Sequence, residues 1–230
     1  MFFDPLYLLF MLPAMALSGW AAWKTRSAFG KYAKVRTMNG LTGAQAAQRM
    51  LASAGITDVE IVATRGHLSD HYNPLNKKLA LSEAVYGSPS IAAVGVACHE
   101  AGHAIQHARH YAPLKLRSAL VPTAKIGSSL GMWVVIGGLV LQMQGLVLAG
   151  IVLFSAVVLF QLVTLPVEFD ASKRAKEVAF QHGLITEQEK EGVAKVLNAA
   201  AMTYVAAAIG SILTLLYFLI RSGLLGGRRS

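Results

Sequence analysis

The sequence predicts a mainly α-helical integral membrane protein with about four transmembrane helices and a small α+β domain outside the bilayer. Hydrophobic residues make up 54% of the 230 residues and charged residues only 14%, well below the roughly 25% typical of a soluble domain. Charge-free stretches long enough to cross a bilayer recur along the chain. Two charged segments with helix and strand patterns separate them.

The first predicted element is an amino-terminal transmembrane anchor over residues 1–23. Residues 5–23 carry no charge for 19 residues, close to the roughly 20 needed to cross a bilayer as a helix. Only Asp4 precedes this run, so the basic region of a cleaved signal peptide is missing and a retained anchor is expected. Basic residues follow at once, and such loops tend to stay cytoplasmic, which predicts an external amino terminus: Lys24, Arg26, Lys31, Lys34 and Arg36.

Residues 24–125 have the composition expected of a folded cytoplasmic segment, with 13 basic and 5 acidic residues. In LTGAQAAQRMLASAG, Thr42 is a possible N-cap and Gly55 a stop for an amphipathic helix. ITDVEIVA and KLALS each predict a short strand, and HYNPLNKK between them supplies turn residues. SIAAVGVACHEAGHAIQHA is apolar and alanine-rich, which predicts a buried helix from residue 90 to about 108.

The second half of the chain predicts three more transmembrane helices. Residues 126–165 contain no Lys, Arg, Asp or Glu, and forty residues suit a helical hairpin with its tip near Gln142 to Gly145. The charged segment 166–198 then returns to the cytoplasmic side, before a last helix and basic tail over 199–230. Four crossings would place Arg221 outside, against the positive-inside tendency, and this conflict stays open. We expect a multi-pass protein of the cell (inner) membrane.

The motif HEAGH within the buried helix predicts a metal-dependent hydrolase. His99 and His103 are four residues apart, so both imidazoles project from one helix face and can bind one metal ion. Zinc held by two imidazoles and a carboxylate keeps a position open for a water whose pKa falls toward about 7. Glu100 would accept that proton and deliver it to the leaving amine. The alternative is a core helix whose three polar side chains satisfy one another.

His107 extends the histidine series by another helical turn. Residues eight apart on a straight helix are about 12 Å apart along its axis, too far for His99, His103 and His107 to share one ion. His107 and His110 are therefore expected beside the site or at the interface.

The third ligand must come from elsewhere in the chain. Glu168 in PVEFDASKRA is the best candidate, since Pro166 could open a helix just past the third span, and Asp170 is the runner-up. The alternative role for this carboxylate is a charged helix start at the membrane surface, favoured by the helix dipole.

Taken together, these segments resemble the neutral zinc metallopeptidases of bacterial membranes often called YugP-type, which are distantly similar to HtpX-like and CAAX prenyl proteases. The likeness rests on the anchor, on LSDHYNPLNKKLALSEAVYG leading into GVACHEAGHAIQHA, on the paired spans and on LPVEFDASKRA. It implies His99, His103 and Glu168 as zinc ligands and Glu100 as general base. In HtpX-like enzymes the glutamate usually begins an ExxxD motif, but here position 172 is Ser.

The resemblance further suggests that KKLALS is an edge strand that holds an extended substrate, although an ordinary strand under the helix fits as well. Ser172 or Asp170 could orient a ligand histidine. Candidates for stabilising an oxyanion are undistinguished by sequence: His71, Tyr72, Arg174, His182 and Tyr204.

The resulting hypothesis is a membrane-embedded zinc endopeptidase with a gluzincin-like site facing the cytoplasm, one Zn²⁺ per chain, and peptide or protein substrates that include membrane or misfolded proteins. The alternative is a catalytically silent zinc-binding scaffold or metal sensor, which has no need of Glu100. The formal net charge is +9, and the basic residues that produce it follow the hydrophobic segments. This placement indicates contact with the lipid bilayer and no nucleic-acid partner. The single cysteine, Cys98, excludes an internal disulfide, and the sequence specifies no oligomeric state.

Overall fold

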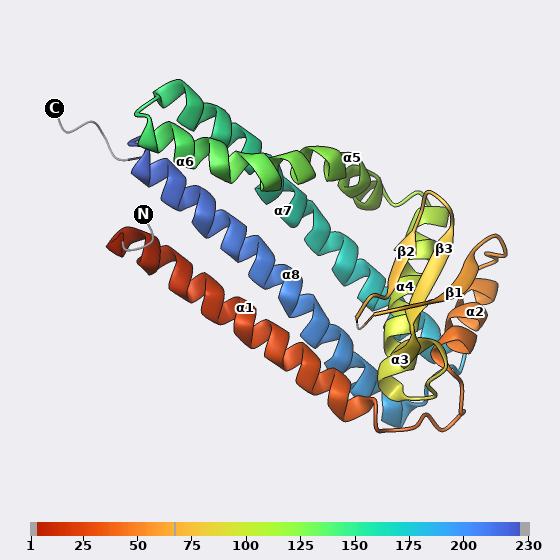
Figure 1. Cartoon of the computed structure of the whole chain (residues 1–230). Coiled ribbons are helices and arrows are strands. Elements are labelled where there is room, and N and C mark those ends of the chain that lie inside the picture. Colours follow the sequence, from red (N-terminus) through yellow and green to blue (C-terminus); the bar gives the residue numbers. More distant parts are fainter. Residues whose placement is uncertain (1–3, 67, 226–230) are drawn as a thin grey trace. The chain divides into compact units, whose positions relative to one another are not determined.

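The computed structural model describes residues 4–66 and 68–225, and helices dominate it (Figure 1). The amino-terminal half contains α1 (Pro5–Tyr32), α2 (Gly43–Ser53), β1 (Glu60–Thr64), β2 (His71–Asn73), β3 (Lys78–Ser82), α3 (Glu83–Tyr86) and α4 (Ile91–Ala108). The remainder contains α5 (Ala112–Ile126), the π-helical turn η1 (Gly127–Gly131), α6 (Met132–Val140), α7 (Gln144–Gln181) and α8 (Glu187–Arg221).

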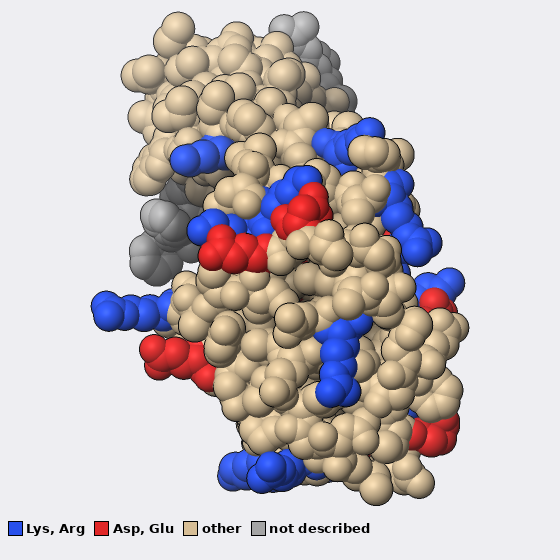
Figure 2. Space-filling view, turned by 90° about the vertical axis from the view of Figure 1, so that its right-hand side faces the viewer, with Lys and Arg blue, Asp and Glu red and all other residues tan. Residues whose placement is uncertain are grey.

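Four helical stretches in the described part of the chain are long and apolar enough to cross a membrane. They are α1, the stretch Ala112–Val140 formed by α5, η1 and α6, α7, and α8. This agrees with the predicted number of spans, and a small sheet accompanies them as expected. On the face shown in Figure 2, much of the surface carries no charged residue, while Lys, Arg, Asp and Glu gather on the rest.

The helices extend well beyond the charge-free runs that predict them. The expectation that Pro166 opens a helix is wrong, because Pro166 lies inside α7. Proline removes one backbone hydrogen bond and normally bends a helix. Membrane helices tolerate proline in their interior because neighbouring helices and side chains can satisfy the freed backbone group. The hairpin turn occupies residues 141–143, where Gln142 has a φ of 54°, and α7 begins at Gln144.

The chain divides into two compact units, and the first contains the most apolar parts of the long helices. It comprises the chain up to Trp20, Lys115–Leu165, and the chain from Thr203 onward. Glycines allow close helix contact there: a Cβ added to Gly138 would lie 2.6 Å from the Val147 nitrogen. The buried cluster at its centre consists of Val135, Val147, Ile151, Phe154, Val158, Tyr217 and Phe218.

The second unit comprises Ala21–Leu114 and Pro166–Met202 and contains the sheet. The strand order is β1-β3-β2, with β3 parallel to β1 and antiparallel to β2. The expectation that KKLALS forms an edge strand is therefore wrong, because β3 has a partner on each side. The sequence HYN, which looked like part of a turn, forms β2 and covers that edge.

Side-chain caps mark the starts of two helices of this unit. Thr42 and Gln45 form a reciprocal capping box at the start of α2, and Gly55, with a φ of 73°, follows its end. Ser90 caps α4 by accepting a hydrogen bond from the Ala93 nitrogen at 3.2 Å. The α4 helix is almost entirely buried, against α2, the sheet and the part of α7 that follows Pro166, and this burial fixes the position of the HEAGH motif.

Candidate metal centre

The α4 helix presents His99 and His103 one turn apart on the same face. Their ring centroids are 4.8 Å apart, and the rings meet edge to face. The side chain of His99 is 13% exposed and that of His103 is 9% exposed, so both are largely shielded from water. Two imidazoles held at this spacing can bind the same ion.

Glu168 of α7 completes the cluster. Its Oε2 atom lies 3.1 Å from Nε2 of His99 and 3.5 Å from Nε2 of His103, and its side chain is 2% exposed. Each of the three side chains offers one ligand atom, and these atoms all lie within 4.8 Å of one another, so the group could hold a metal ion. Two imidazole nitrogens and one carboxylate oxygen are a donor set that zinc accepts. The structure thus brings together the three residues proposed from the sequence, and their role as ligands stays a prediction.

A glycine inside the motif allows the two helices to come so close. A Cβ added to Gly102 would lie 2.7 Å from the Ala171 carbonyl oxygen and 3.2 Å from the Ala171 Cα. Backbone atoms cannot yield as a flexible side chain does, so any side chain at position 102 would push α4 and α7 apart. Since Glu168 lies one turn from Ala171, its reach to the histidines depends on this contact.

Gln106 determines which nitrogen of His103 faces Glu168. The carboxamide Nε2 donates to the Val167 carbonyl and to Oδ2 of Asp170, both at 2.8 Å, so the amide orientation is fixed. Its Oε1 must then accept the proton of His103 Nδ1 at 3.0 Å. In neutral His103 the proton therefore lies on Nδ1, which leaves Nε2, the nitrogen on the Glu168 side, available to a metal ion. Sequence reasoning missed Gln106, which is fully buried; its only sequence signal was an uncharged polar residue within an apolar helix pattern.

Ser172 plays the corresponding part at His99. Its Oγ lies 3.1 Å from Nδ1 of His99, which leaves Nε2 toward Glu168. Asp170, the alternative third ligand, bonds instead to Gln106 and to Arg174, whose Nη2 is 3.3 Å from Oδ1. Both residues that the sequence suggested as orienting groups therefore contact the cluster, Ser172 directly and Asp170 through Gln106.

The charges around His103 favour its protonated form when no metal is present. Burial would lower the pKa of His103, but the hydrogen bonds to Glu168 and Gln106 and the negative charges of Glu100 and Glu168 together raise it. Glu100 is 8% exposed and follows His99 directly on α4. The cluster is therefore electronegative and attracts a cation, either a proton or a metal ion.

The remaining candidate residues lie in several different parts of the chain. His107 is bonded through Nδ1 to the hydroxyl of Tyr72 on β2 at 2.8 Å, in accord with its exclusion from a three-histidine site. His71 contacts the Ser69 carbonyl, and Tyr204 belongs to the other compact unit. Whether Tyr72, Arg174 or any other of these side chains stabilises an oxyanion stays a prediction.

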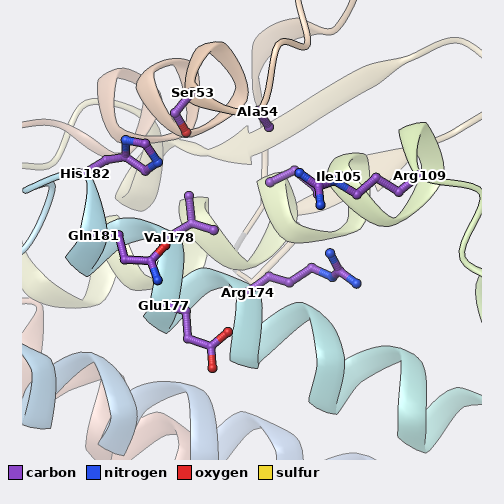
Figure 3. Close-up of a pocket in the computed structure, with 9 residues that line it drawn as sticks. All are labelled: Ser53, Ala54, Ile105, Arg109, Arg174, Glu177, Val178, Gln181 and His182. Carbon is purple, nitrogen blue, oxygen red and sulfur yellow. The ribbon is translucent and has the colours of Figure 1, made fainter.

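A cavity of about 280 Å³ opens beside α4 and α7 in the second unit (Figure 3). Arg109 and Arg174 both reach toward it, and His182 lines it from the end of α7. Arg174 also packs over the ring of Tyr111, with its Cζ 5.8 Å from the centroid. Because Arg174 also bonds to Asp170, this side chain connects the cavity with the Asp170–Gln106–His103 series of hydrogen bonds.

Comparison with known proteins found a family model and a curated relative that match most of the chain. A family model described as "Putative neutral zinc metallopeptidase" matches residues 7–223. The chain is 46% identical over 215 residues to "Putative membrane protease YugP" from Bacillus subtilis (strain 168), which covers 94% of this chain and 96% of that protein. No solved structure matches the chain.

Proposed function

The chain belongs to the putative neutral zinc metallopeptidase family, and from this premise we propose that it is a membrane-embedded, zinc-dependent endopeptidase with a gluzincin-like site. The observation that carries the proposal is the convergence of His99, His103 and Glu168 from two helices. In this proposal those three residues hold one Zn²⁺, and Glu100, beside His99, is the general base. The substrates are peptides or proteins, among them membrane or misfolded proteins.

In the proposed reaction, one side chain transfers protons and two others orient the proposed ligands. A bound zinc ion supplies Lewis-acid chemistry that makes water more acidic and polarises a peptide carbonyl. Glu100 accepts a proton from the attacking water and passes it to the leaving amide nitrogen. Gln106 and Ser172 keep Nδ1 of His103 and His99 engaged, so that both Nε2 atoms remain directed at Glu168.

The proposed location follows from the order of the segments. Residues 1–23, 126–165 and 199–230 supply the membrane spans, and the catalytic segments 24–125 and 166–198 face the cytoplasm from the cell (inner) membrane. The four apolar helices support insertion in a membrane. The excess of basic residues in 24–125 supports the cytoplasmic side.

Metal analysis of four detergent-purified proteins tests the assignment: wild type, His103→Ala, Glu168→Ala and Glu100→Gln, each also assayed for casein cleavage. We expect about one zinc per chain in wild type and Glu100→Gln and a loss of zinc in the other two. Cleavage should fall about 10²-fold or more in Glu100→Gln, since general-base catalysis contributes roughly 10²–10⁴-fold.

Other outcomes would reject parts of the proposal. Wild type without metal would overturn the metal site, and zinc retained by Glu168→Ala would reject Glu168 as a ligand. Cleavage that persists undiminished in Glu100→Gln would reject its role as base. Zinc retained without cleavage of casein or of any membrane substrate would favour the catalytically silent scaffold.

A further inference from the structure

A second cavity lies between α1 and α8 in the second unit, away from the metal centre residues. Its volume is about 480 Å³, within the roughly 300–1,000 Å³ range of small-molecule sites. The residues that matter here are three lysines, two aromatic residues and an asparagine: Lys24, Lys31, Lys195, Trp23, Tyr32 and Asn198. None of them has a part in the proposed peptidase chemistry.

The cavity lies at the level where both helices change from apolar to charged. On α1 the charge-free run ends at Trp23, and Lys24 follows. On α8 the last apolar run begins at Ala199, directly after Asn198. The Thr25 hydroxyl donates to the Ala199 carbonyl at 2.9 Å, so the two boundaries are side by side. In a membrane protein this level is that of the lipid headgroups, where Trp and Lys are enriched.

The charge around the cavity is positive. Lys24, Lys31 and Lys195 contribute three ammonium groups, and Glu191 forms an ion pair with Lys195 and offsets one of them. Nζ of Lys31 lies 5.5 Å from the centroid of the Tyr32 ring, which holds this ammonium at the cavity wall. An anion bound here would therefore face ammonium groups from both helices.

We propose that this cavity binds the phosphate-bearing headgroup of an anionic phospholipid. The lysines would bind the phosphate as point charges. Trp23 is 65% exposed, and its indole would lie among the headgroups. The acyl chains would follow the charge-free stretch of α1 into the bilayer. A free phosphate offers the lysines the same anionic oxygens but gains nothing from this apolar continuation, so the lipid is the assigned ligand.

Native mass spectrometry and thermal unfolding of the purified full chain test the proposal. The ligand is dioleoyl phosphatidylglycerol added to detergent micelles, and the comparisons are dioleoyl phosphatidylcholine and glycerol 3-phosphate. We expect saturable adducts and a raised unfolding midpoint with phosphatidylglycerol alone. The matched variants each remove three positive charges: Lys24→Gln/Lys31→Gln/Lys195→Gln at the cavity, and Lys77→Gln/Lys78→Gln/Lys173→Gln at exposed ion pairs elsewhere.

The cavity variant should bind phosphatidylglycerol at least about tenfold more weakly than the wild type, and the control variant should bind it as the wild type does, since each lysine near a headgroup contributes to attraction. An equal loss in both variants would show a general charge effect and overturn the site. A response to glycerol 3-phosphate or an equal response to phosphatidylcholine would overturn the lipid assignment. Should the triple variant fail to fold, Lys31→Gln alone should still weaken binding relative to Lys173→Gln, and equal binding by these two would overturn the proposal.

Discussion

The carboxamide oxygen of Gln106 lies 3.0 Å from Nδ1 of His103, and this bond directs Nε2 of the same ring toward Glu168. The amide is itself held by the Val167 carbonyl and by Asp170. A fully buried residue outside the proposed ligand set thus orients one of the proposed ligands.

Gln106→Leu should weaken zinc binding by roughly 10–100-fold, because the His103 ring loses the partner that fixes its orientation. The variant should also lose about 1–3 kcal/mol of stability, since buried partners are left unpaired. A chelator competition assay measures the affinity, and the same change at the exposed Gln48 of α2 is the control. Equal zinc affinity in both variants would show that Gln106 has no orienting role.

Gly102→Ala should disrupt the centre through the backbone alone. The new methyl group would lie 2.7 Å from the Ala171 carbonyl oxygen, so α4 and α7 must separate and Glu168 must withdraw from the histidines. We expect a lower unfolding midpoint and a loss of zinc. Gly30→Ala is the control, because nothing lies within 4 Å of its added Cβ and alanine favours a helix by about 1 kcal/mol. A Gly102→Ala protein that unfolds and binds zinc like wild type would contradict the close approach of the helices.

Zinc binding should strengthen as the pH rises. Because the folded pKa of His103 is above its ordinary value of 6.5, its proton stabilises the metal-free fold fully below about 6.5. That contribution is lost as the pH rises through the folded pKa, and zinc, which needs neutral imidazole, then binds without displacing a proton. Titrations of zinc from pH 5.5 to 8.5 measure this. Glu100→Gln, which removes one of the charges that raise the pKa, should move the midpoint to lower pH, and an unmoved midpoint would contradict this cause.

Cys98 should resist alkylation in the native protein. Complete burial raises its pKa from 9.0 to about 12, so almost no thiolate exists at pH 8 and no reagent reaches the sulfur. Iodoacetamide should add no mass to the native chain and one carbamidomethyl group in denaturant. Because the folded pKa is raised, this thiol favours the fold below pH 9, and the contribution is lost between about 9 and 12. Rapid native labelling would show that α4 opens.

The features predicted well from the sequence are those that local patterns determine. Charge-free runs indicated the long helices, Thr42 and Gly55 bounded α2, and the spacing of His99 and His103 placed both rings on one face. The pairing of Glu168 with these rings depends on two helices distant in sequence, so only residue chemistry and family resemblance could suggest it. Resemblance to the family is confirmed by the comparisons.

The features missed depend on tertiary contacts. Strand β3 lies in the middle of the sheet because β2 pairs with its second edge. Strand β2 has only three residues, too few for a clear alternation of apolar and polar residues in the sequence. Helix α7 passes through Pro166 although proline removes one helical hydrogen bond, whereas an argument from propensity starts or ends a helix at proline. Gln106 gained its importance from three partners, two of them on α7.

Helix α7 contains both the charge-free stretch, which ends at Leu165, and Glu168, so the number of residues between them limits the distance of this carboxylate from the apolar stretch. Glu168 is three residues past Leu165, which corresponds to roughly 4.5 Å of helix rise. In the proposed peptidase, a scissile bond must therefore come within about one helical turn of the bilayer surface. Chains already embedded in the membrane meet this condition without a search in three dimensions, whereas a freely diffusing protein must first reach the surface. Selection of substrates would then depend on distance from the lipid more than on side-chain identity.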